Sequence, residues 1–239
     1  MTTAVTKPRF FALIPCAGNG SRAETNQPKQ YQLLAGQAVV WHTLRAFREV
    51  PAISGIAVVV SPLDDTFRQV CPDFHQPGDQ LAAVGGSTRA ASVCNGLKAL
   101  LGHAAMPGDW VLVHDAARCL VTPQQIEALI QVCEGDSVGG LLALPLPDTL
   151  KSSVAGRVAQ TIERADKWLA QTPQMFKIGA LLAALEAAGE AVTDESSAME
   201  LLGLKPLLVP GSAQNFKLTY PQDFALAQAI LQSRMKAAQ

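Results

Sequence analysis

The chain has 239 residues, of which 49% are hydrophobic and only 16% are charged, against roughly 25% charged in an average soluble domain. Lysine and arginine number 19 and the acidic residues 20, so the chain has no net field that would attract nucleic acid or an anionic membrane. Any polyanion that it binds is therefore expected to be small. The five cysteines form no C-x-x-C pair, which argues against a zinc site or a disulfide framework and favours free thiols in a reducing compartment.

Residues 1–9 contain no apolar segment typical of a signal peptide, and no uninterrupted apolar run reaches the roughly 18 residues of a membrane span. We therefore expect a cytoplasmic protein.

Short apolar runs bounded by turn residues alternate with segments of helical periodicity, which is typical of repeated strand–helix–strand units. Strands are predicted at residues 10–14, 56–60, 81–84, 110–113, 139–144, 207–209 and 216–218. Helices are predicted at residues 39–47, 93–101, 122–133, 177–188 and 222–235, with a shorter one after Asp194. This order predicts one α/β domain over residues 1–239, with a Rossmann-like, mostly parallel sheet covered by helices on both faces.

The pattern changes between about residues 145 and 170, where the sequence becomes more polar. Weak strand signals surround Thr149 and Thr161. We expect a β-arm that stands off the main sheet, of the kind that often serves a partner subunit.

The first predicted strand runs directly into a glycine-rich loop, PCAGNGSR at residues 15–22. Glycine-rich turns at the carboxyl end of a strand are where open α/β sheets bind phosphates. Gly18 and Gly20 let backbone N–H groups approach an anion, and Arg22 and Lys29 add two positive charges beside the loop. A plain strand-to-helix turn is the alternative, and the two cations favour phosphate over it.

The same glycines satisfy the G-x-G-x-x-A pattern of a dinucleotide fold, but the context does not fit. Pro28 interrupts the following helix, and residues 34–44 contain no acidic side chain for a ribose. No Walker A sequence occurs either.

Two further strand ends carry polar residues. Residues 85–89, GGSTR, follow a predicted strand and open a helix, so their backbone N–H groups could contact a nucleobase or ribose. Taken alone, such a sequence is more often a turn and a helix cap. Asp115 and Arg118 follow the strand at residues 110–113, where the carboxylate could position a hydrated Mg²⁺ and the guanidinium could bind phosphate. The alternative is an aspartate that caps a turn. We interpret His114 as structural.

In chain order the motifs PCAGNGSR with PKQY, GGSTRAASV, VLVHDAAR, LPDTLK, TIERADKW to QTPQMF, AVTDESSA and NFKLT resemble those of the sugar-phosphate cytidylyltransferases. The sequence is most similar to the 2-C-methyl-D-erythritol 4-phosphate cytidylyltransferases of the non-mevalonate isoprenoid pathway. The resemblance covers essentially the whole chain. It implies the nucleotide-diphospho-sugar transferase type of fold and transfer of CMP from CTP to methylerythritol phosphate, with release of pyrophosphate.

The resemblance also implies roles for individual residues and a homodimer whose arm serves the neighbour's site. Catalysis is assigned to Arg22, Lys29 and Lys217. The nucleotide is assigned to Ala17, Gly18, Asn19, Gly20, Gly86, Ser87, Ser92, Asp115 and Ala116, and Asp115 also to the Mg²⁺ cofactor. The phosphorylated substrate is assigned to Arg118, Thr149, Arg164, Thr172 and Thr193.

Three residues depart from the family pattern: Ser87 where some members have aspartate, Cys119 where proline is usual, and Ala23 where methionine is usual. None removes a charge that the chemistry needs, although the change at Ser87 bears on recognition of the base. Two alternatives stay open at this stage, a ribitol 5-phosphate cytidylyltransferase and a nucleotide-binding module without turnover.

Overall fold

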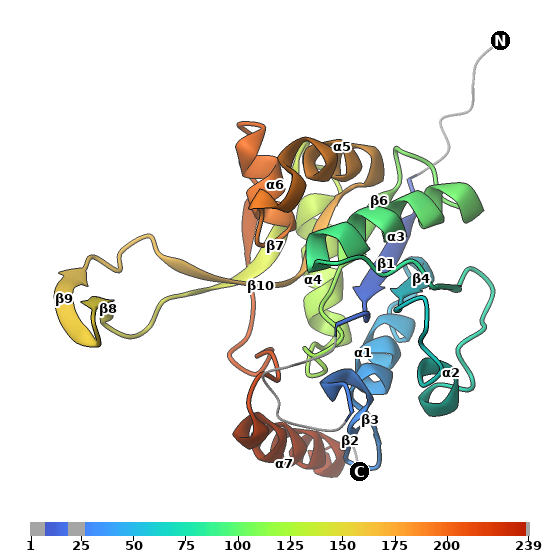
Figure 1. The fold of residues 1–239 in the computed structure, drawn as a ribbon, viewed down its shortest axis with the longest axis horizontal. Coiled ribbons are helices and arrows are strands. Elements are labelled where there is room, and N and C mark those ends of the chain that lie inside the picture. The colour runs from blue at the N-terminus through green and yellow to red at the C-terminus, as the bar shows by residue number, and fades with distance from the viewer. Residues whose placement is uncertain (1–7, 19–26, 238–239) are drawn as a thin grey trace.

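The structure, a computed structural model, describes residues 8–18 and 27–237 (Figure 1). Within them, seven strands form one sheet in the order β11-β7-β10-β6-β1-β4-β5. Their bounds are β1 Phe10–Pro15, β4 Ile53–Val59, β5 Gln80–Ala82, β6 Trp110–Val113, β7 Gly139–Pro145, β10 Trp168–Lys177 and β11 Leu207–Pro210. All neighbouring pairs are parallel except those of β10, which runs antiparallel to both β6 and β7. The predicted α/β fold with a mostly parallel sheet is confirmed.

Helices cover both faces of this sheet because the strands are apolar on both sides. The helices are α1 Val39–Arg48, α2 Phe67–Val70, α3 Arg89–His103, α4 Pro123–Cys133, α5 Ile178–Ala188, α6 Glu195–Leu201 and α7 Pro221–Ala237, with 3-10 turns η2 Lys29–Tyr31 and η3 Gly189–Ala191. Along β1, Ala12 and Ile14 pack in a core shared with α1 and α4, whereas Phe11 and Leu13 pack in a core shared with α3, α5 and α6. A third cluster joins α7 to the start of α1.

A capping box fixes the start of α4. Thr122 caps α4 and accepts a hydrogen bond from the N–H of Gln125, while the Gln125 side chain accepts one from the N–H of Thr122. This capping box satisfies donors that the helix leaves open. Pro123 follows as the first helical residue, so the predicted start at Thr122 and Pro123 is confirmed.

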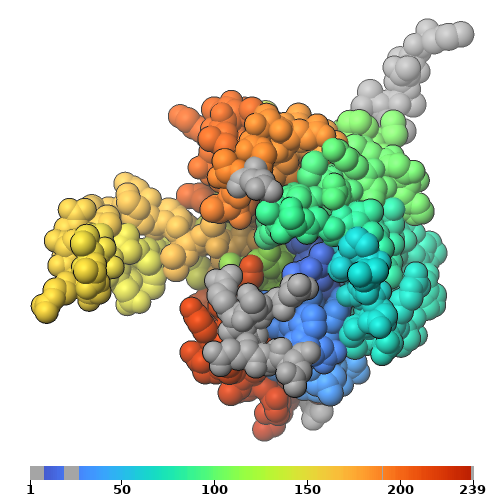
Figure 2. All heavy atoms as spheres, viewed as in Figure 1, coloured from blue at the N-terminus to red at the C-terminus, as the bar shows by residue number. Residues whose placement is uncertain are grey.

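The predicted β-arm is also present. β8 Leu150–Val154 and β9 Arg157–Ile162 form an antiparallel hairpin that is a separate two-stranded sheet. Figure 2 shows this hairpin, in yellow, as a lobe that stands away from the body of the molecule. Its surface is partly apolar, since Val154 is 71% exposed and Val158 is 68% exposed.

One predicted strand is absent from the described residues, and three of the strands in the structure were not predicted. The segment 216–218, predicted as a strand, belongs to no strand. Phe216 and Leu218 pack with α7, and within the described residues the segment's backbone hydrogen bond to another part of the backbone is a single one, from Leu218 N to Ala117 O. Conversely, β10 was not predicted. The hairpin of β2 Leu33–Leu34 and β3 Gln37–Ala38 was not predicted either.

None of the helices in the described ranges is long and apolar enough to cross a membrane. The five cysteines are free thiols, as expected.

Candidate functional site

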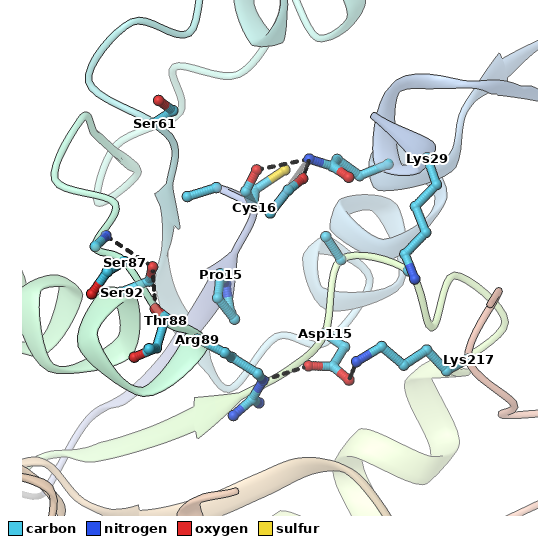
Figure 3. Close-up of a pocket in the computed structure, with 16 residues that line it drawn as sticks. Pro15, Cys16, Lys29, Ser61, Ser87, Thr88, Arg89, Ser92, Asp115 and Lys217 are labelled. Atoms are coloured by element: carbon cyan, nitrogen blue, oxygen red, sulfur yellow. Dashed lines mark hydrogen bonds and ion pairs between the residues drawn. The ribbon is translucent and has the colours of Figure 1, made fainter. Parts of the chain in front are cut away.

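A cavity of about 520 Å³ opens at the carboxyl ends of β1 and β6, where parallel α/β sheets bind their ligands. Three loops and two lysines enclose it (Figure 3). Its lining residues within the described part of the chain are Pro15, Cys16, Ala17, Gly18, Lys29, Gln30, Ser61, Gly86, Ser87, Thr88, Arg89, Ser92, Asp115, Ala116, Ala117 and Lys217.

The first loop is held from behind by a buried glutamine. Gln30 lies in η2, and its side-chain amide donates to Cys16 O at 2.9 Å and to Gly18 O at 2.8 Å. Cys16 N donates in turn to Val59 O at 2.7 Å. Because these carbonyl groups are tied to Gln30, the start of the glycine-rich loop has a defined course along the cavity.

The second loop packs against the first so closely that a side chain has no room. A Cβ atom added at Gly85 would lie 2.4 Å from Ala17 Cβ, so glycine allows the two loops to meet. Gly86 N donates to Ser92 Oγ at 3.0 Å, and Ser92 Oγ donates to Thr88 O at 2.9 Å. The loop is therefore a rigid turn that begins α3.

Asp115 lies among three cationic side chains at the cavity. Its Oδ1 lies 2.8 Å from Arg89 Nε, and its Oδ2 lies 2.8 Å from Lys217 Nζ and 3.8 Å from Arg118 Nε. Figure 3 shows Arg89 and Lys217 reaching this carboxylate from opposite sides. Burial alone would raise the pKa of Asp115, but the charges of Arg89 and Lys217 outweigh it and hold that pKa well below its usual range.

Lys29 contacts the chain segment that carries Lys217. Lys29 Nζ donates to Leu218 O at 2.8 Å, although the two residues are 189 positions apart. Leu218 directly follows Lys217 in sequence, so the Lys29 ammonium group lies against the backbone from which the Lys217 side chain extends to Asp115. Both lysines line the cavity, and Figure 3 shows Lys217 ending at the Asp115 carboxylate.

A chain of buried hydrogen bonds supports Asp115 from beneath. His114 Nε2 lies 3.1 Å from Arg118 O, which can only accept, so Nε2 carries the ring proton. Burial lowers the pKa of His114 to about 4, so the ring is neutral and Nδ1 accepts from the Thr172 hydroxyl at 3.0 Å. The Thr172 oxygen then accepts from Asp115 N at 3.1 Å. The structural role expected for His114 agrees with these bonds.

This neutral imidazole predicts a specific acid dependence of stability. Between pH 6.5 and about 4 the unfolded chain binds a proton at His114 that the folded chain does not. The free energy of unfolding should therefore fall as the pH falls through this window, by about 3 kcal/mol in total for this one group. The depressed pKa of Asp115 acts only below its ordinary value of 3.8, so the two effects separate.

Urea unfolding at several pH values between 4.5 and 7 measures this slope. The His114→Gln variant should unfold with a slope smaller by about one proton near pH 5. Equal slopes in the two proteins would show that His114 takes up its proton in the folded state as well.

Comparison with known protein families matches residues 10–233 to IspD, 2-C-methyl-D-erythritol 4-phosphate cytidylyltransferase. The chain belongs to this family. It is 53% identical over 227 residues to the enzyme of that name from Chromobacterium violaceum, which covers 94% of this chain and 99% of the relative. It is 65% identical over 231 residues to the bifunctional enzyme IspD/IspF of Albidiferax ferrireducens, where it spans 96% of its own length but only 54% of the relative.

Solved structures of the IspD family have the same fold. A crystal structure of 4-diphosphocytidyl-2C-methyl-D-erythritol synthase superposes with a TM-score of 0.84 at 41% identity, covering 94% of this chain and 99% of that one. The 2-C-methyl-D-erythritol 4-phosphate cytidylyltransferase of Francisella tularensis gives 0.78 at 32% identity, covering 92% and 98%.

The cavity of this IspD-family chain brings together most residues that the sequence assigned to catalysis and to the nucleotide. Those lining it are Ala17, Gly18, Lys29, Gly86, Ser87, Ser92, Asp115, Ala116 and Lys217. Asn19, Gly20 and Arg22 lie outside the described residues.

The residues assigned to the phosphorylated substrate do not line this cavity. Arg118 is tied to Asn215 O at 2.7 Å and lies next to Asp115. Thr172 is buried beneath Asp115, and Thr193 is exposed just before α6. Thr149 and Arg164 are exposed on the arm and its base, where Arg164 donates to Pro147 O. Their assigned roles stay predictions.

Sequence reasoning overlooked Arg89, Glu195 and Gln30. Arg89 and Glu195 occur inside two of the quoted motifs, but they are 106 positions apart and nothing in the sequence shows that they pair. Gln30 lies within the quoted PKQY segment. Its buried amide contacts the backbone of the first loop, which residue type alone does not reveal.

Asp115 is the acidic side chain among the lining residues. Groups of three or more metal-binding side chains do not occur in the described part of the chain. Mg²⁺ is commonly held by one or two carboxylates together with substrate phosphates. A permanently anionic Asp115 fits that donor set, with most ligands coming from the nucleotide and from water.

Proposed function

We propose that this cavity is the site where CMP is transferred from CTP to 2-C-methyl-D-erythritol 4-phosphate. The products are 4-diphosphocytidyl-2-C-methyl-D-erythritol and pyrophosphate, in the non-mevalonate route to isoprenoid precursors. Membership of the IspD family supports the reaction. The observation that carries the location is the convergence of Lys217 and Arg89 on one carboxylate, Asp115, in a cavity that Lys29 also lines, at the carboxyl ends of the strands.

The charge balance around the cavity suits a triphosphate. Four described cations, Lys29, Arg89, Arg118 and Lys217, lie around two carboxylates, Asp115 and Glu195. The local excess is positive, although the whole chain carries a net charge of −1. A small polyanion is therefore attracted to this cavity and not to the surface in general.

The proposed chemistry needs no general base. A phosphate monoester has a second pKa near about 6 and is largely dianionic at neutral pH. One of its oxygens attacks the α-phosphorus of CTP, a new P–O bond forms, and the bond to the β-phosphate oxygen breaks so that pyrophosphate leaves with the electron pair. His114, buried and engaged at both ring nitrogens, takes no part in this step.

Catalysis then depends on positioning and on charge. Lys29 and Lys217, together with Arg22, stabilise the negative charge that gathers on the pentacoordinate α-phosphate and on the departing pyrophosphate. Mg²⁺ held near Asp115 would supply further neutralisation of the triphosphate.

We propose that the second loop, residues 85–89, binds the nucleoside of CTP. Gly86, Ser87 and Ser92 form one wall of the cavity, and Ser92 Oγ keeps an acceptor lone pair beyond its two bonds within the loop. Ser87 offers a hydroxyl that can donate or accept. We therefore assign base selection to the Ser87 and Ser92 hydroxyl groups on this turn.

We also propose that the active protein is a homodimer through the β-arm. Thr149 and Arg164 do not line the cavity of their own chain, and the arm carries exposed valines that a partner could cover. A two-fold dimer in which each arm reaches the other subunit would bring these residues to a site.

Mixing two inactive variants tests the exchange of arms. Arg164→Ala damages the arm and Lys217→Ala damages the cavity, so a mixed dimer contains one intact pairing of cavity and arm. Random mixing after co-refolding should restore about a quarter of wild-type turnover. Mixtures that stay inactive, alongside active wild-type protein treated in the same way, would show that each arm serves its own chain.

The free thiols agree with the reducing interior of a cell, and we place the protein in the cytoplasm. Burial raises the pKa of Cys71 to about 11 and that of Cys119 to about 12. Such buried thiols are unreactive.

Pyrophosphate release tests the function. CTP with methylerythritol 4-phosphate and Mg²⁺ is compared with ribitol 5-phosphate as acceptor, with ATP, GTP and UTP as donors, and with EDTA in place of the metal. We expect turnover only with CTP, methylerythritol phosphate and Mg²⁺. Turnover with ribitol phosphate alone would change the assigned acceptor to ribitol phosphate. Nucleotide binding without any turnover would contradict the assignment of the transfer reaction.

A further inference from the structure

One guanidinium in the wall of the cavity bridges two carboxylates. Arg89 Nε lies 2.8 Å from Asp115 Oδ1, while Nη1 and Nη2 lie 2.6 and 3.0 Å from the two oxygens of Glu195. The Glu195 side chain is 1% exposed and does not line the cavity. Burial would lower the pKa of Arg89, but Glu195 and Asp115 outweigh it and raise that pKa, so the guanidinium stays charged.

The far end of this bridge is anchored to the sheet. Glu195 is the first residue of α6, whose start is capped by Asp194 and Ser197 and is joined to Gln174 of β10. The Gln174 side chain accepts from Ser196 N at 2.7 Å and donates to Asp194 Oδ2 at 2.8 Å. These contacts fix the backbone at Glu195, and the carboxylate itself is held by its burial and by its two bonds to Arg89.

At the other end of the bridge, Arg89 sets the orientation of the Asp115 carboxylate. With Oδ1 held by Arg89, Oδ2 faces Lys217 Nζ at 2.8 Å. Catalytic groups act fully only when they are held within about 0.5 Å of their productive position. A lysine side chain has four flexible carbons, and Lys217 is 37% exposed, so its position depends on this carboxylate.

We propose that Arg89 and Glu195 are positioning residues for the transfer reaction, which act through Asp115 on Lys217. The inference rests on the proposed function. Glu195 orients the guanidinium fork, the fork orients Asp115, and Asp115 places the lysine where charge develops. Lysine at position 89 could not replace arginine, because one ammonium group cannot make the same bonds to two carboxylates at once.

The test separates positioning from stability. Arg89→Met leaves Glu195 buried without its partner and should lower Tm, whereas the double variant Arg89→Met/Glu195→Gln removes both buried charges and should recover much of that loss. We expect kcat of the double variant to stay about 10-fold to 100-fold below wild type, with KM for CTP within about threefold. Arg89→Lys should not restore kcat.

Arg48→Met provides the matched control, because Arg48 forms an ion pair with Asp79 at 2.8 Å outside the cavity. It should lower Tm and leave kcat unchanged. Recovery of kcat together with Tm in the double variant would overturn the inference, as would a loss confined to KM for CTP, which would indicate direct contact with the nucleotide. Wild-type protein in the same assay separates this from failure of the proposed function, since that failure would abolish wild-type turnover too.

Discussion

The Lys217→Ala variant is expected to lose a factor of about 100 to 1,000 in kcat, equivalent to about 3–4 kcal/mol of transition-state stabilisation. Lys217 is partly exposed and its ammonium lies 2.8 Å from Asp115 Oδ2. Asp115 keeps its bond to Arg89 when the lysine is removed, so the chain should fold normally. Steady-state pyrophosphate release and a thermal unfolding scan measure the two quantities.

Lys98→Ala is the control for this variant. Lys98 is a surface lysine that pairs with Glu186 at 2.8 Å and does not line the cavity, so its removal should leave turnover unchanged. Lys29→Ala should resemble Lys217→Ala, since both lysines line the same cavity. Near-normal turnover in either cavity variant would refute the assignment of these lysines to catalysis.

The Asp115→Asn variant is expected to lose both turnover and stability. The substitution leaves Arg89, Arg118 and Lys217 close together without the anion that joins them. Breaking a buried ion pair at one partner costs about 3–5 kcal/mol in folding stability. Turnover should fall by a factor of about 100 or more, because the lysine is no longer placed and a metal ligand is lost.

A magnesium titration distinguishes metal binding by Asp115 from its ion pairs with the neighbouring cationic side chains. The concentration of Mg²⁺ that gives half-maximal activity should rise about tenfold or more in Asp115→Asn. Asp79→Asn is the matched control, because it removes a buried carboxylate paired with Arg48 away from the cavity and should lower stability only. An unchanged magnesium requirement in Asp115→Asn would show that the carboxylate serves the cations alone.

Most of the fold follows from local signals in the sequence. The apolar runs that became β1, β4, β6 and β7 are bounded by turns, and the capping box at Thr122 marks a helix start without reference to the rest of the chain. Such elements are predictable because their hydrophobic pattern and their end residues point to the same structure.

The strand β10 was missed because polar residues conceal it. Gln171, Thr172 and Gln174 are buried in the middle of the strand with Pro173 among them, so the segment has no hydrophobic pattern of period two. Each polar side chain is satisfied by the site around it, as Thr172 is by His114 and Asp115. A strand that supports a functional site departs from the apolar pattern for that reason.

The candidate site was predictable to the extent that it lies at strand ends. Lys29, Asp115 and Lys217 were identified from their place in motifs, and the structure brings them to one cavity. The pairing of Arg89 with Glu195 was not predictable, because it depends on how α3 and α6 pack in the same core on one face of the sheet.

A crystal structure of the chain grown with CTP and Mg²⁺ would locate the nucleotide directly. We expect the triphosphate between Lys29 and Lys217, the metal beside Asp115, and the base against Gly86 and Ser92. CTP bound elsewhere, for instance in the second cavity at the base of the arm beside Arg164 and Lys167, with nothing between the two lysines, would contradict the placement of the active site.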